Sequence, residues 1–178
     1  MRLVDSHCHL QADRFEADVD LVLGGARLAG VERILVPAWD PASCVGALAL
    51  VDRFPWLDAA VGVHPHDAAN VDGAAWAEIV ALAADPRVVA IGETGLDYDR
   101  VFSPILAQLA NLRRNLRLAA ETGCRISIGT DAHTPSELGV MSLGVASALV
   151  AGLKREQILN YLSEAELRAW VRRRRGRA

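Results

Sequence analysis

Short apolar runs alternate with longer segments in which apolar residues recur at helical spacing, from residue 3 to residue 129. The apolar runs lie at 3–4, 32–39, 57–63, 87–92 and 124–129, and the helix-period segments lie at 19–26, 41–51, 76–83 and 105–119. Strands that alternate with helices in this way are typical of βαβ units in a parallel sheet. The pattern therefore predicts an α/β fold with about five parallel β-α units.

Residues with special backbone preferences mark the ends of several segments. Asp40 followed by Pro41 is typical of a helix start, and Asp85-Pro86 is typical of a helix stop. After the fifth apolar run the alternation gives way to helix signals only. A capping-box pattern at 134–137 predicts a helix to about Gly152, and a second pattern at 163–166 predicts the last helix. The C-terminal end is therefore expected to be helical.

The chain has 178 residues, fewer than the roughly 250 of a complete eight-stranded α/β barrel. No composition break or low-complexity linker divides it, which predicts one domain over residues 1–178. A sheet of five strands cannot close as an eight-stranded barrel does. We therefore expect its open edges to be covered by the terminal helices or by a second subunit of a homo-oligomer.

Charge, cysteine content and hydropathy exclude several classes of protein. The net charge of −3 gives no basic field over the whole molecule, so nucleic acid would have to be bound locally or through a metal ion. The three cysteines, Cys8, Cys44 and Cys124, are dispersed, which predicts free thiols in a reducing compartment. No signal-peptide pattern or membrane-length apolar run is present, so we expect a cytoplasmic protein without a membrane partner. The sequence also lacks a row of aromatic residues that could stack on the bases of a single-stranded nucleic acid.

The first strand runs directly into His7 and His9. Residues two apart on an extended strand point to the same side, with Cα atoms roughly 6.5 to 7 Å apart, so both imidazoles could bind one metal ion. The alternative is a chance pair of histidines in a mobile N-terminus. We favour the metal site because buried histidines so close together would otherwise need partners for four ring nitrogens.

Polar residues follow the later strands at the same end. His64 follows the third strand, Glu93 the fourth and Asp131 the fifth. The carboxyl ends of parallel strands share one edge, so these side chains are expected to converge with the first two histidines. Glu93 could bridge two ions, and Asp131 could hold one and orient water. The alternatives are a salt bridge between Glu93 and a neighbouring arginine and a helix cap at Asp131.

Three more histidines extend this candidate site. Asp131-Ala132-His133 repeats the spacing of the first motif, so His133 could add an imidazole to the ligand set, although it could also be a polar loop residue. His64 and His66 flank Pro65 and could be metal ligands or donors to a substrate phosphate. We favour substrate contact because five other residues already supply ligands.

Three stretches, VDSHCHL, GVHPHD and IGETGLDYDR, resemble in order and spacing the motifs of the TatD family of metal-dependent deoxyribonucleases, over about residues 3–123. The resemblance implies that His7 and His9 bind one metal ion and that Glu93 bridges two. It also implies that His64 and His66 line the phosphate pocket.

The third motif adds two substrate-binding candidates. Tyr98 and Arg100 match the family pattern after the bridging glutamate, whereas Asp99 stands where the family usually has an aromatic residue. By the same resemblance, the strand at 124–129 would end in another metal-binding histidine, and this chain has Gly129 there.

Residues 124–178 resemble the C-terminal end of PHP domains, particularly those of bacterial family X DNA polymerases. The stretch ISIGTDAHTPSELGV carries a DAH triplet, which is a metal-binding motif in that family and implies such a role for Asp131 and His133. The chain is thus similar to a TatD-like part, 1–123, joined to a PHP-like part, 124–178. Both families imply a metallo-dependent hydrolase (TIM-like) barrel, here truncated or incomplete.

These features predict a metal-dependent phosphoester hydrolase, a TatD-like deoxyribonuclease that acts as an exonuclease on DNA ends. The alternatives are a PHP-type phosphatase on small phosphomonoesters and a non-catalytic metal-binding remnant. The expected cofactors are one or two Mg, Mn or Zn ions, with Glu93 and Asp131 as catalytic residues. The ligands would be His7, His9, Glu93, Asp131 and His133. In this hypothesis the metal acidifies water and Asp131 accepts its proton.

Overall fold

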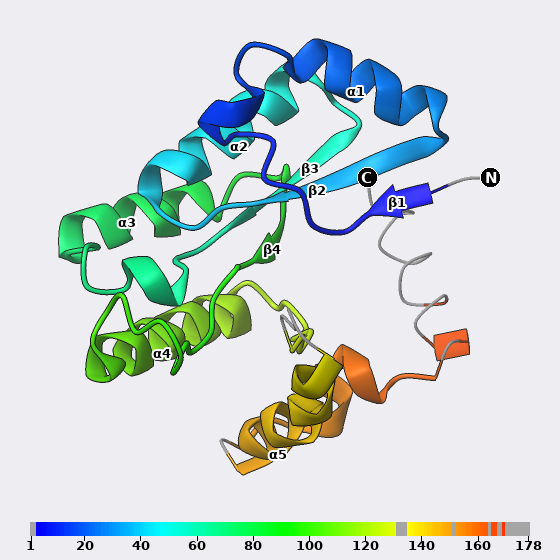
Figure 1. Ribbon diagram of the computed structural model, residues 1–178. Helices are drawn as coiled ribbons and strands as arrows, with labels where there is room; N and C mark the ends of the chain where they lie inside the picture. Colours follow the sequence, from blue (N-terminus) through cyan, green and yellow to red (C-terminus); the bar gives the residue numbers. More distant parts are fainter. Residues whose placement is uncertain (1–2, 131–134, 151, 164, 167–168, 170–178) are drawn as a thin grey trace. The chain divides into compact units, whose positions relative to one another are not determined.

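The structure is a computed structural model that describes residues 3–130, 135–150, 152–163, 165, 166 and 169 (Figure 1). The chain forms two compact units, Met1–Thr122 and Gly123–Ala178. The single domain expected over 1–178 stays a prediction. No helix among the described residues is long and apolar enough to cross a membrane.

The first unit is built on a four-stranded parallel sheet in the order β1-β2-β3-β4. Its strands are β1 (Leu3–Asp5), β2 (Val31–Pro37), β3 (Leu57–Val61) and β4 (Val88–Ile91). Its helices are α1 (Val19–Leu28), α2 (Pro41–Arg53), α3 (Gly73–Leu82) and α4 (Ile105–Glu121), with short 3-10 turns at Asp13–Phe15 and Pro65–Asp67. The first four β-α units are confirmed, and their order is that of one arc of a TIM-like barrel.

The helices α1 to α4 follow one another around the outside of the sheet in Figure 1, and apolar side chains fill the space between the layers. One buried cluster joins Val36 of β2 and Leu57 of β3 to Leu48 and Val51 of α2. A second cluster includes Val61, Val63, Cys44 and Ile79. The two central strands are therefore held by helix packing, while β1 and β4 lie at the edges of the described sheet.

The start of α2 shows how local sequence shapes the strand ends. The Asp40 carboxylate accepts a hydrogen bond from the Ser43 amide at 2.7 Å, and Ser43 Oγ accepts one from the Asp40 amide at 2.9 Å. Ser43 Oγ also accepts a hydrogen bond from the Trp39 amide at 2.8 Å. This capping box confirms the helix start predicted at Asp40-Pro41 and holds the residue that follows β2 in place.

The buried face of α4 is polar at its centre. The helix predicted at 105–119 is confirmed, but Gln108, Asn111 and Asn115 are its most deeply buried side chains, together with Leu118 and Ala119. Asn111 Nδ2 donates to Val63 O at 2.7 Å, and Asn115 Oδ1 accepts from Val63 N at 3.3 Å. These amides satisfy backbone groups that follow β3, where the sheet ladder has ended.

The second unit does not contain the fifth strand predicted at 124–129. Within its described residues, this segment forms one isolated parallel bridge, between Ile126 and Ile158. The side chain of Asn160 bonds to both backbone groups of Ile128, at 2.8 Å each. A run of apolar residues becomes a strand only if a neighbouring backbone pairs along its length, and here a side chain replaces that backbone.

The helix predicted from 134 to about Gly152 is shorter than expected. Pro135–Val140 forms a 3-10 helix, and the α-helix proper is α5 (Met141–Val150), followed by 3-10 turns at Arg155–Gln157 and Leu159–Tyr161. Position 134 lies outside the described residues. At the second capping box, the Ser163 amide donates to Glu166 Oε2 at 2.8 Å, and the Glu166 amide donates to Ser163 Oγ at 3.3 Å, so this predicted pattern is confirmed.

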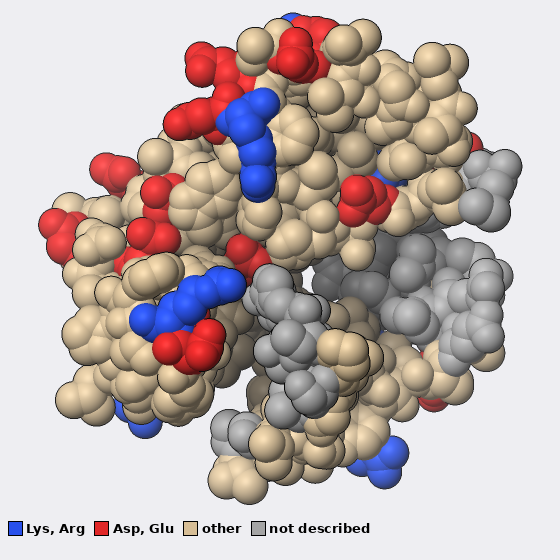
Figure 2. All heavy atoms as spheres, in the orientation of Figure 1, with Lys and Arg blue, Asp and Glu red and all other residues tan. Residues whose placement is uncertain are grey.

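Charged side chains of both signs are interspersed with uncharged ones on the face drawn in Figure 2. Several surface arginines of the first unit pair with carboxylates, as in Arg33–Asp58, Arg53–Asp20 and Arg87–Asp85. Paired charges of this kind leave little net positive potential on a surface. Any contact with nucleic acid must therefore depend on local features of a site.

Candidate functional site

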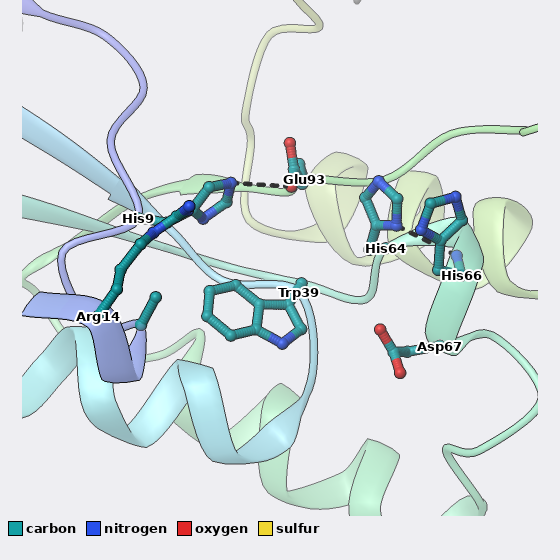
Figure 3. A pocket seen from close by; sticks show the side chains of 8 residues that line it. His9, Arg14, Trp39, His64, His66, Asp67 and Glu93 are labelled. Carbon is teal, nitrogen blue, oxygen red and sulfur yellow. Dashed lines mark hydrogen bonds and ion pairs between the residues drawn. The ribbon is translucent and has the colours of Figure 1, made fainter.

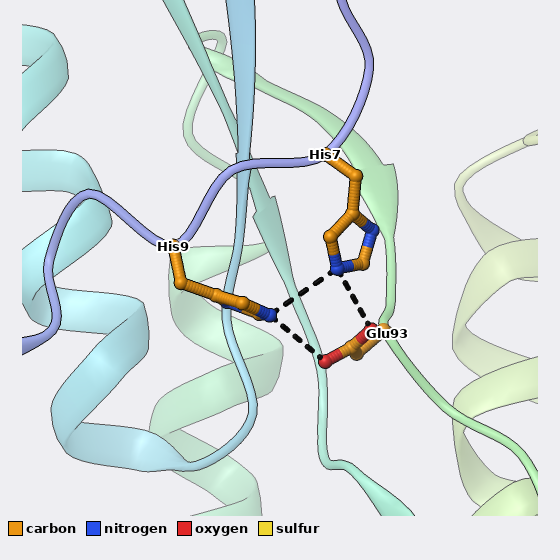
Figure 4. Close-up of side chains that lie close together, drawn as sticks. All are labelled: His7, His9 and Glu93. Atoms are coloured by element: carbon orange, nitrogen blue, oxygen red, sulfur yellow. Dashed lines mark hydrogen bonds and ion pairs between the residues drawn. The ribbon is translucent and has the colours of Figure 1, made fainter. Parts of the chain in front are cut away.

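Three predicted ligands lie together at the carboxyl edge of the sheet, as Figure 4 shows. His7 Nε2 lies 3.2 Å from Glu93 Oε2, and His9 Nε2 lies 3.4 Å from Glu93 Oε1. The two imidazole nitrogens are 3.2 Å apart. The ligand atoms of all three residues lie within 4.8 Å of one another, so one cation could contact them all.

Backbone contacts with β2 hold the two histidines. The Cys8 amide donates to Leu35 O at 3.1 Å, which continues the pairing of β1 with β2 beyond the strand. His9 Nδ1 lies 3.0 Å from Pro37 O. Because a carbonyl oxygen only accepts, Nδ1 carries the ring hydrogen, and the Nε2 of a neutral His9 presents its lone pair to the site.

Glu93 reaches this site because β4 approaches β3 closely at its end. The Gly92 amide donates to Val61 O at 2.9 Å, and the Glu93 amide donates to Ala38 O at 3.1 Å. A Cβ atom on Gly62 would lie 2.9 Å from both N and Cα of Gly92, so only glycine fits at position 62 in this arrangement. The backbone thereby places the carboxylate opposite the two imidazoles.

The three side chains fit a divalent metal ion. In a neutral His9 the lone pair of Nε2 faces a carboxylate oxygen, so two acceptors are directed at each other over 3.4 Å. A divalent cation would be held by the two imidazoles and the carboxylate and would replace this repulsion by attraction. Imidazole and carboxylate ligands of this kind suit a divalent metal ion, and the identity of that ion stays a prediction.

An open pocket of about 330 Å³ adjoins these ligands. It is referred to as the strand-end pocket and is lined by His9, Ala12, Arg14, Trp39, His64, His66, Asp67 and Glu93 (Figure 3). Residues that follow β1, β2, β3 and β4 therefore share one cavity, as the strand-end rule predicts. His64 and His66 lie in the same pocket as two of the candidate metal ligands.

His66 is held from two directions. Its Nε2 forms an ion pair with Asp97 Oδ2, and its backbone carbonyl accepts a hydrogen bond from Ser103 Oγ at 2.6 Å. The His66 amide donates to His64 Nδ1 at 3.1 Å, and the two rings meet edge to face at 4.3 Å. Phe102 packs against the other side of the His66 ring at 4.7 Å.

Asp97 is in turn fixed by the loop that contains it. Its Oδ1 accepts hydrogen bonds from the Asp99 and Arg100 amides at 2.8 and 2.9 Å. Gln108, which is fully buried, accepts from the Asp97 amide at 2.7 Å and donates to the carbonyls of Asp97 and Ser103 at 3.0 and 2.8 Å. The hydrogen bond with His66, followed by that from Arg100, lowers the pKa of Asp97 from its usual 3.8 to about 2.

Because the pKa of Asp97 is lowered, the free energy of unfolding at acid pH tests the ion pair between His66 and Asp97. A carboxylate whose pKa falls on folding contributes stability that is complete above its unfolded pKa and disappears as pH falls to the folded value. We expect Asp97→Asn to reduce the free energy of unfolding at neutral pH and to flatten its decline between about pH 4 and pH 2. Urea unfolding over this pH range would measure the change.

Asp85, beside Arg87, also has a pKa lowered to about 2, so part of the decline of stability with falling pH should remain in Asp97→Asn. A matched control is needed for the substitution itself. Asp99→Asn removes an exposed carboxylate from the same loop as Asp97 and should keep the wild-type slope. Identical slopes for Asp97→Asn and wild type would show that the ion pair with His66 does not contribute to folding.

Two further predicted substrate-binding residues, Tyr98 and Arg100, are not part of this group. Tyr98 is 66% exposed, Arg100 is exposed, and neither lines the strand-end pocket. Their side chains therefore lie outside the pocket in which substrate contact was expected. Asp131 and His133 fall outside the described residues, so their role as ligands stays a prediction.

Sequence reasoning did not select several residues that shape the pocket or hold its histidines, among them Arg14, Trp39, Asp97 and Gln108. For Trp39 and Asp97 a signal existed. Trp39 is the last residue of the second apolar run, so it lies at a strand end as the histidines do, and Asp97 lies within the motif around Glu93. Nothing in the sequence distinguishes Gln108 from a solvated helix residue.

Residues 4–140 match the model of the family described as TatD related DNase. This chain belongs to that family. The match extends beyond the boundary near residue 123 that was predicted for the TatD-like part. None of the similar proteins described below supports the PHP resemblance of residues 124–178.

Relatives of known sequence agree with this assignment. The chain is 36% identical over 126 residues to the uncharacterized metal-dependent hydrolase YabD of Bacillus subtilis, covering 71% of this chain and 49% of YabD. It is 38% identical over 133 residues to the 3'-5' ssDNA/RNA exonuclease TatD of Citrobacter rodentium, covering 74% of this chain and 51% of that protein. The chain thus spans about half the length of these relatives.

Solved structures support the fold. The TatD homologue YjjV of Escherichia coli superposes with a TM-score of 0.66 at 30% identity, covering 71% of this chain and 49% of YjjV. A TatD family hydrolase from Entamoeba histolytica gives a TM-score of 0.71 at 22% identity, covering 85% of this chain and 55% of that protein. The α/β fold of a truncated TIM-like metallo-dependent hydrolase is therefore confirmed.

Proposed function

We propose that this chain is a metal-dependent phosphoester hydrolase that removes nucleotides from the ends of DNA. The observation that supports this proposal most directly is the convergence of His7, His9 and Glu93 beside a pocket that also contains His64 and His66. Metal ligands on one side and imidazole donors on the other are the parts that hydrolysis of a phosphate ester requires.

His7, His9 and Glu93 would hold the first divalent ion, and Asp131 and His133 are proposed to complete its ligand set. A divalent ion supplies a Lewis acid that polarises the phosphate and makes water more acidic. Whether one or two ions bind, and whether they are Mg, Mn or Zn, belongs to this proposal rather than to the family assignment.

Side chains of the protein would bind the phosphate and accept the proton of the attacking water. In the proposed mechanism, the Nε2–H of His64 donates to a phosphate oxygen, because its Nδ1 already accepts a hydrogen bond from the His66 amide. A protonated His66 ring would donate through Nδ1, and both donors would stabilise the charge that builds up on the phosphate. Asp97 keeps the hydrogen of His66 on Nε2, because its carboxylate only accepts, and so limits the ring to one orientation. Asp131 is proposed to accept the proton of the attacking water.

The relatives support nucleic acid as the substrate class. The Citrobacter rodentium protein is a 3'-5' ssDNA/RNA exonuclease by name, and 38% identity over the shared half makes a related substrate the first choice for this chain. A small phosphomonoester is the competing substrate, as expected for a PHP-type phosphatase. A metal-binding protein without hydrolytic activity is the third possibility.

Parallel assays of the purified full chain separate these three. We expect release of nucleotides from end-labelled single-stranded DNA with Mg, Mn or Zn, little hydrolysis of a chromogenic phosphomonoester, and no activity in excess EDTA. Hydrolysis of the phosphomonoester alone would replace the nuclease by a phosphatase. Inactivity on both substrates, with metal bound at stoichiometric level, would leave a binding protein and overturn the proposal.

A homo-oligomer is part of the same proposal. In the described part of the first unit, β1 and β4 each pair with a strand on one side only. Unpaired strand edges favour association, and a second copy of the chain could cover them. Light scattering should then give the mass of a dimer or larger assembly. A cytoplasmic location stays a prediction.

A further inference from the structure

We infer that Trp39 and Arg14 form a subsite for the terminal nucleotide of a single-stranded nucleic acid, with the base stacked on the indole and the next phosphate beside the guanidinium. This inference rests on the proposed function, which places the reacting phosphate near Glu93 and the two histidines of the loop after β3. The inference concerns the two groups of the nucleic acid next to that phosphate, which are the terminal base and the following phosphate.

Trp39 occupies the middle of the strand-end pocket. In Figure 3 its indole lies between His9 and Arg14 on one side and His64 and His66 on the other. A phosphate bound between the metal ligands and the two loop histidines would therefore have the indole beside it. Every base has an apolar face that stacks on such a ring, so the contact would not depend on base identity.

The indole is not needed to fill the protein core. Trp56 packs against the first buried cluster and Trp76 against the second. Trp39 belongs to neither cluster in the described part of the chain, and it is only half-buried. A large apolar ring that lines an open pocket without joining the core leaves surface available to a ligand.

The position of Trp39 is nevertheless fixed before any ligand binds. Its amide donates to Ser43 Oγ at 2.8 Å, and its carbonyl accepts from the His64 amide at 2.9 Å. Its ring meets His9 edge to face at 5.2 Å, with 76° between the planes. Because the backbone is held at both its polar groups and the ring rests against His9, the side chain loses little conformational freedom when a base stacks on it, which favours binding.

The charges around the pocket predict on which side the nucleic acid strand leaves it. No carboxylate pairs with Arg14 among the described residues, and its guanidinium lies over the Phe15 ring, 5.6 Å from the centroid. Asp67 lies on the opposite side of the pocket, beyond Trp39 (Figure 3). A strand of phosphates is attracted by the arginine and repelled by the aspartate, so it should leave the pocket past Arg14.

The sequence contains no row of aromatic residues for stacking, and the proposed subsite does not require one. The residues that could stack on bases are not consecutive. The fold brings Trp39 beside the histidines that follow β3, and its ring is the one large aromatic surface among the residues that line the pocket.

The test is equilibrium binding of the full chain to fluorescently labelled oligonucleotides in EDTA, so that hydrolysis does not interfere. One oligonucleotide has a normal terminal base, and two others carry an abasic residue at the 3' or the 5' end. We expect the wild type to bind the normal strand about 5- to 100-fold more tightly than one of the abasic strands. Trp39→Ala should reduce this ratio to near one, and Trp39→Phe should keep most of it.

The role of Arg14 is tested by the dependence of binding on salt concentration. Arg14→Gln should weaken binding of normal and abasic strands equally and should lower the slope of log Kd against log salt by about one phosphate contact. Arg117→Gln removes an exposed arginine from α4 and is the matched control. A slope for Arg14→Gln equal to that of wild type would remove Arg14 from the subsite.

The outcomes separate this inference from the proposed function. Equal affinity of the wild type for normal and abasic strands overturns the subsite, even if the metal-loaded chain hydrolyses DNA. A preference for the terminal base that depends on Trp39 supports the subsite, even if no hydrolysis is found with any metal. If Trp39→Ala still binds the normal strand more tightly than the abasic strand, the base is bound elsewhere and the inference is wrong.

Discussion

Replacement of Glu93 by glutamine should abolish stoichiometric binding of a divalent cation and lower DNA hydrolysis at least about 100-fold, since even residues that only support metal ligands cost about 10- to 100-fold. The carboxylate is the one anionic ligand of the described group, and both imidazoles face its oxygens. An amide keeps the shape of the side chain but removes the charge and one acceptor. Calorimetric titration with Mn or Zn and metal analysis of the purified protein measure the effect.

Glu78→Gln is the control for the chemical change, because Glu78 is exposed on α3. It should bind metal as the wild type does. The thermal unfolding midpoint of metal-free Glu93→Gln should be close to that of the metal-free wild type, whereas added metal should raise only the wild-type value. Full metal affinity in Glu93→Gln would place the ion elsewhere and would remove the main support for the proposed hydrolase.

Gly62→Ala should destabilise the chain by about 1–3 kcal/mol and weaken metal binding, although Gly62 is not itself one of the proposed ligands. The added Cβ would lie 2.9 Å from the Gly92 backbone and 3.0 Å from Asn115 Oδ1. No flexible side chain can yield at this contact, so the end of β4 must move, and Glu93 moves with it. Urea unfolding and metal titration of the same sample measure the two effects.

Gly24→Ala is the matched control for this substitution. A Cβ on Gly24 meets nothing within 4 Å, and the residue lies inside α1, where alanine stabilises a helix by about 0.5–1 kcal/mol relative to glycine. We therefore expect opposite signs for the two substitutions. Wild-type metal affinity in Gly62→Ala would show that the backbone contact between β3 and β4 does not position the carboxylate.

The elements that were predicted correctly have local causes. The four β-α units follow from apolar spacing, and the start of α2 follows from Asp40, Pro41 and Ser43, which act within a few residues of one another. The failed strand at 124–129 has a non-local cause. Its apolar run matches a strand, but a strand requires backbone pairing along its length. In the described residues the backbone bridge is that of Ile126 with Ile158, and at Ile128 the side chain of Asn160 takes the place of a neighbouring backbone.

The candidate site divides in the same way. Its metal ligands could be predicted because each one follows a strand, and parallel strands end at one edge. The ion pair between His66 and Asp97 joins residues 31 positions apart, and no periodicity reports such a pair. Gln108 reads as a polar helix residue, yet the loop that carries Asp97 buries it completely.

The sequence by itself determined the order of strands and helices and the chemical identity of the side chains at the strand ends, because both depend on spacing and residue type along the chain. Only the tertiary structure decided that Trp39 and Arg14 share a pocket with the histidines and that α4 turns an amide face inward. The physical reason is that burial and unpaired backbone groups are properties of the packed molecule, so the partners that satisfy them are set when distant segments meet.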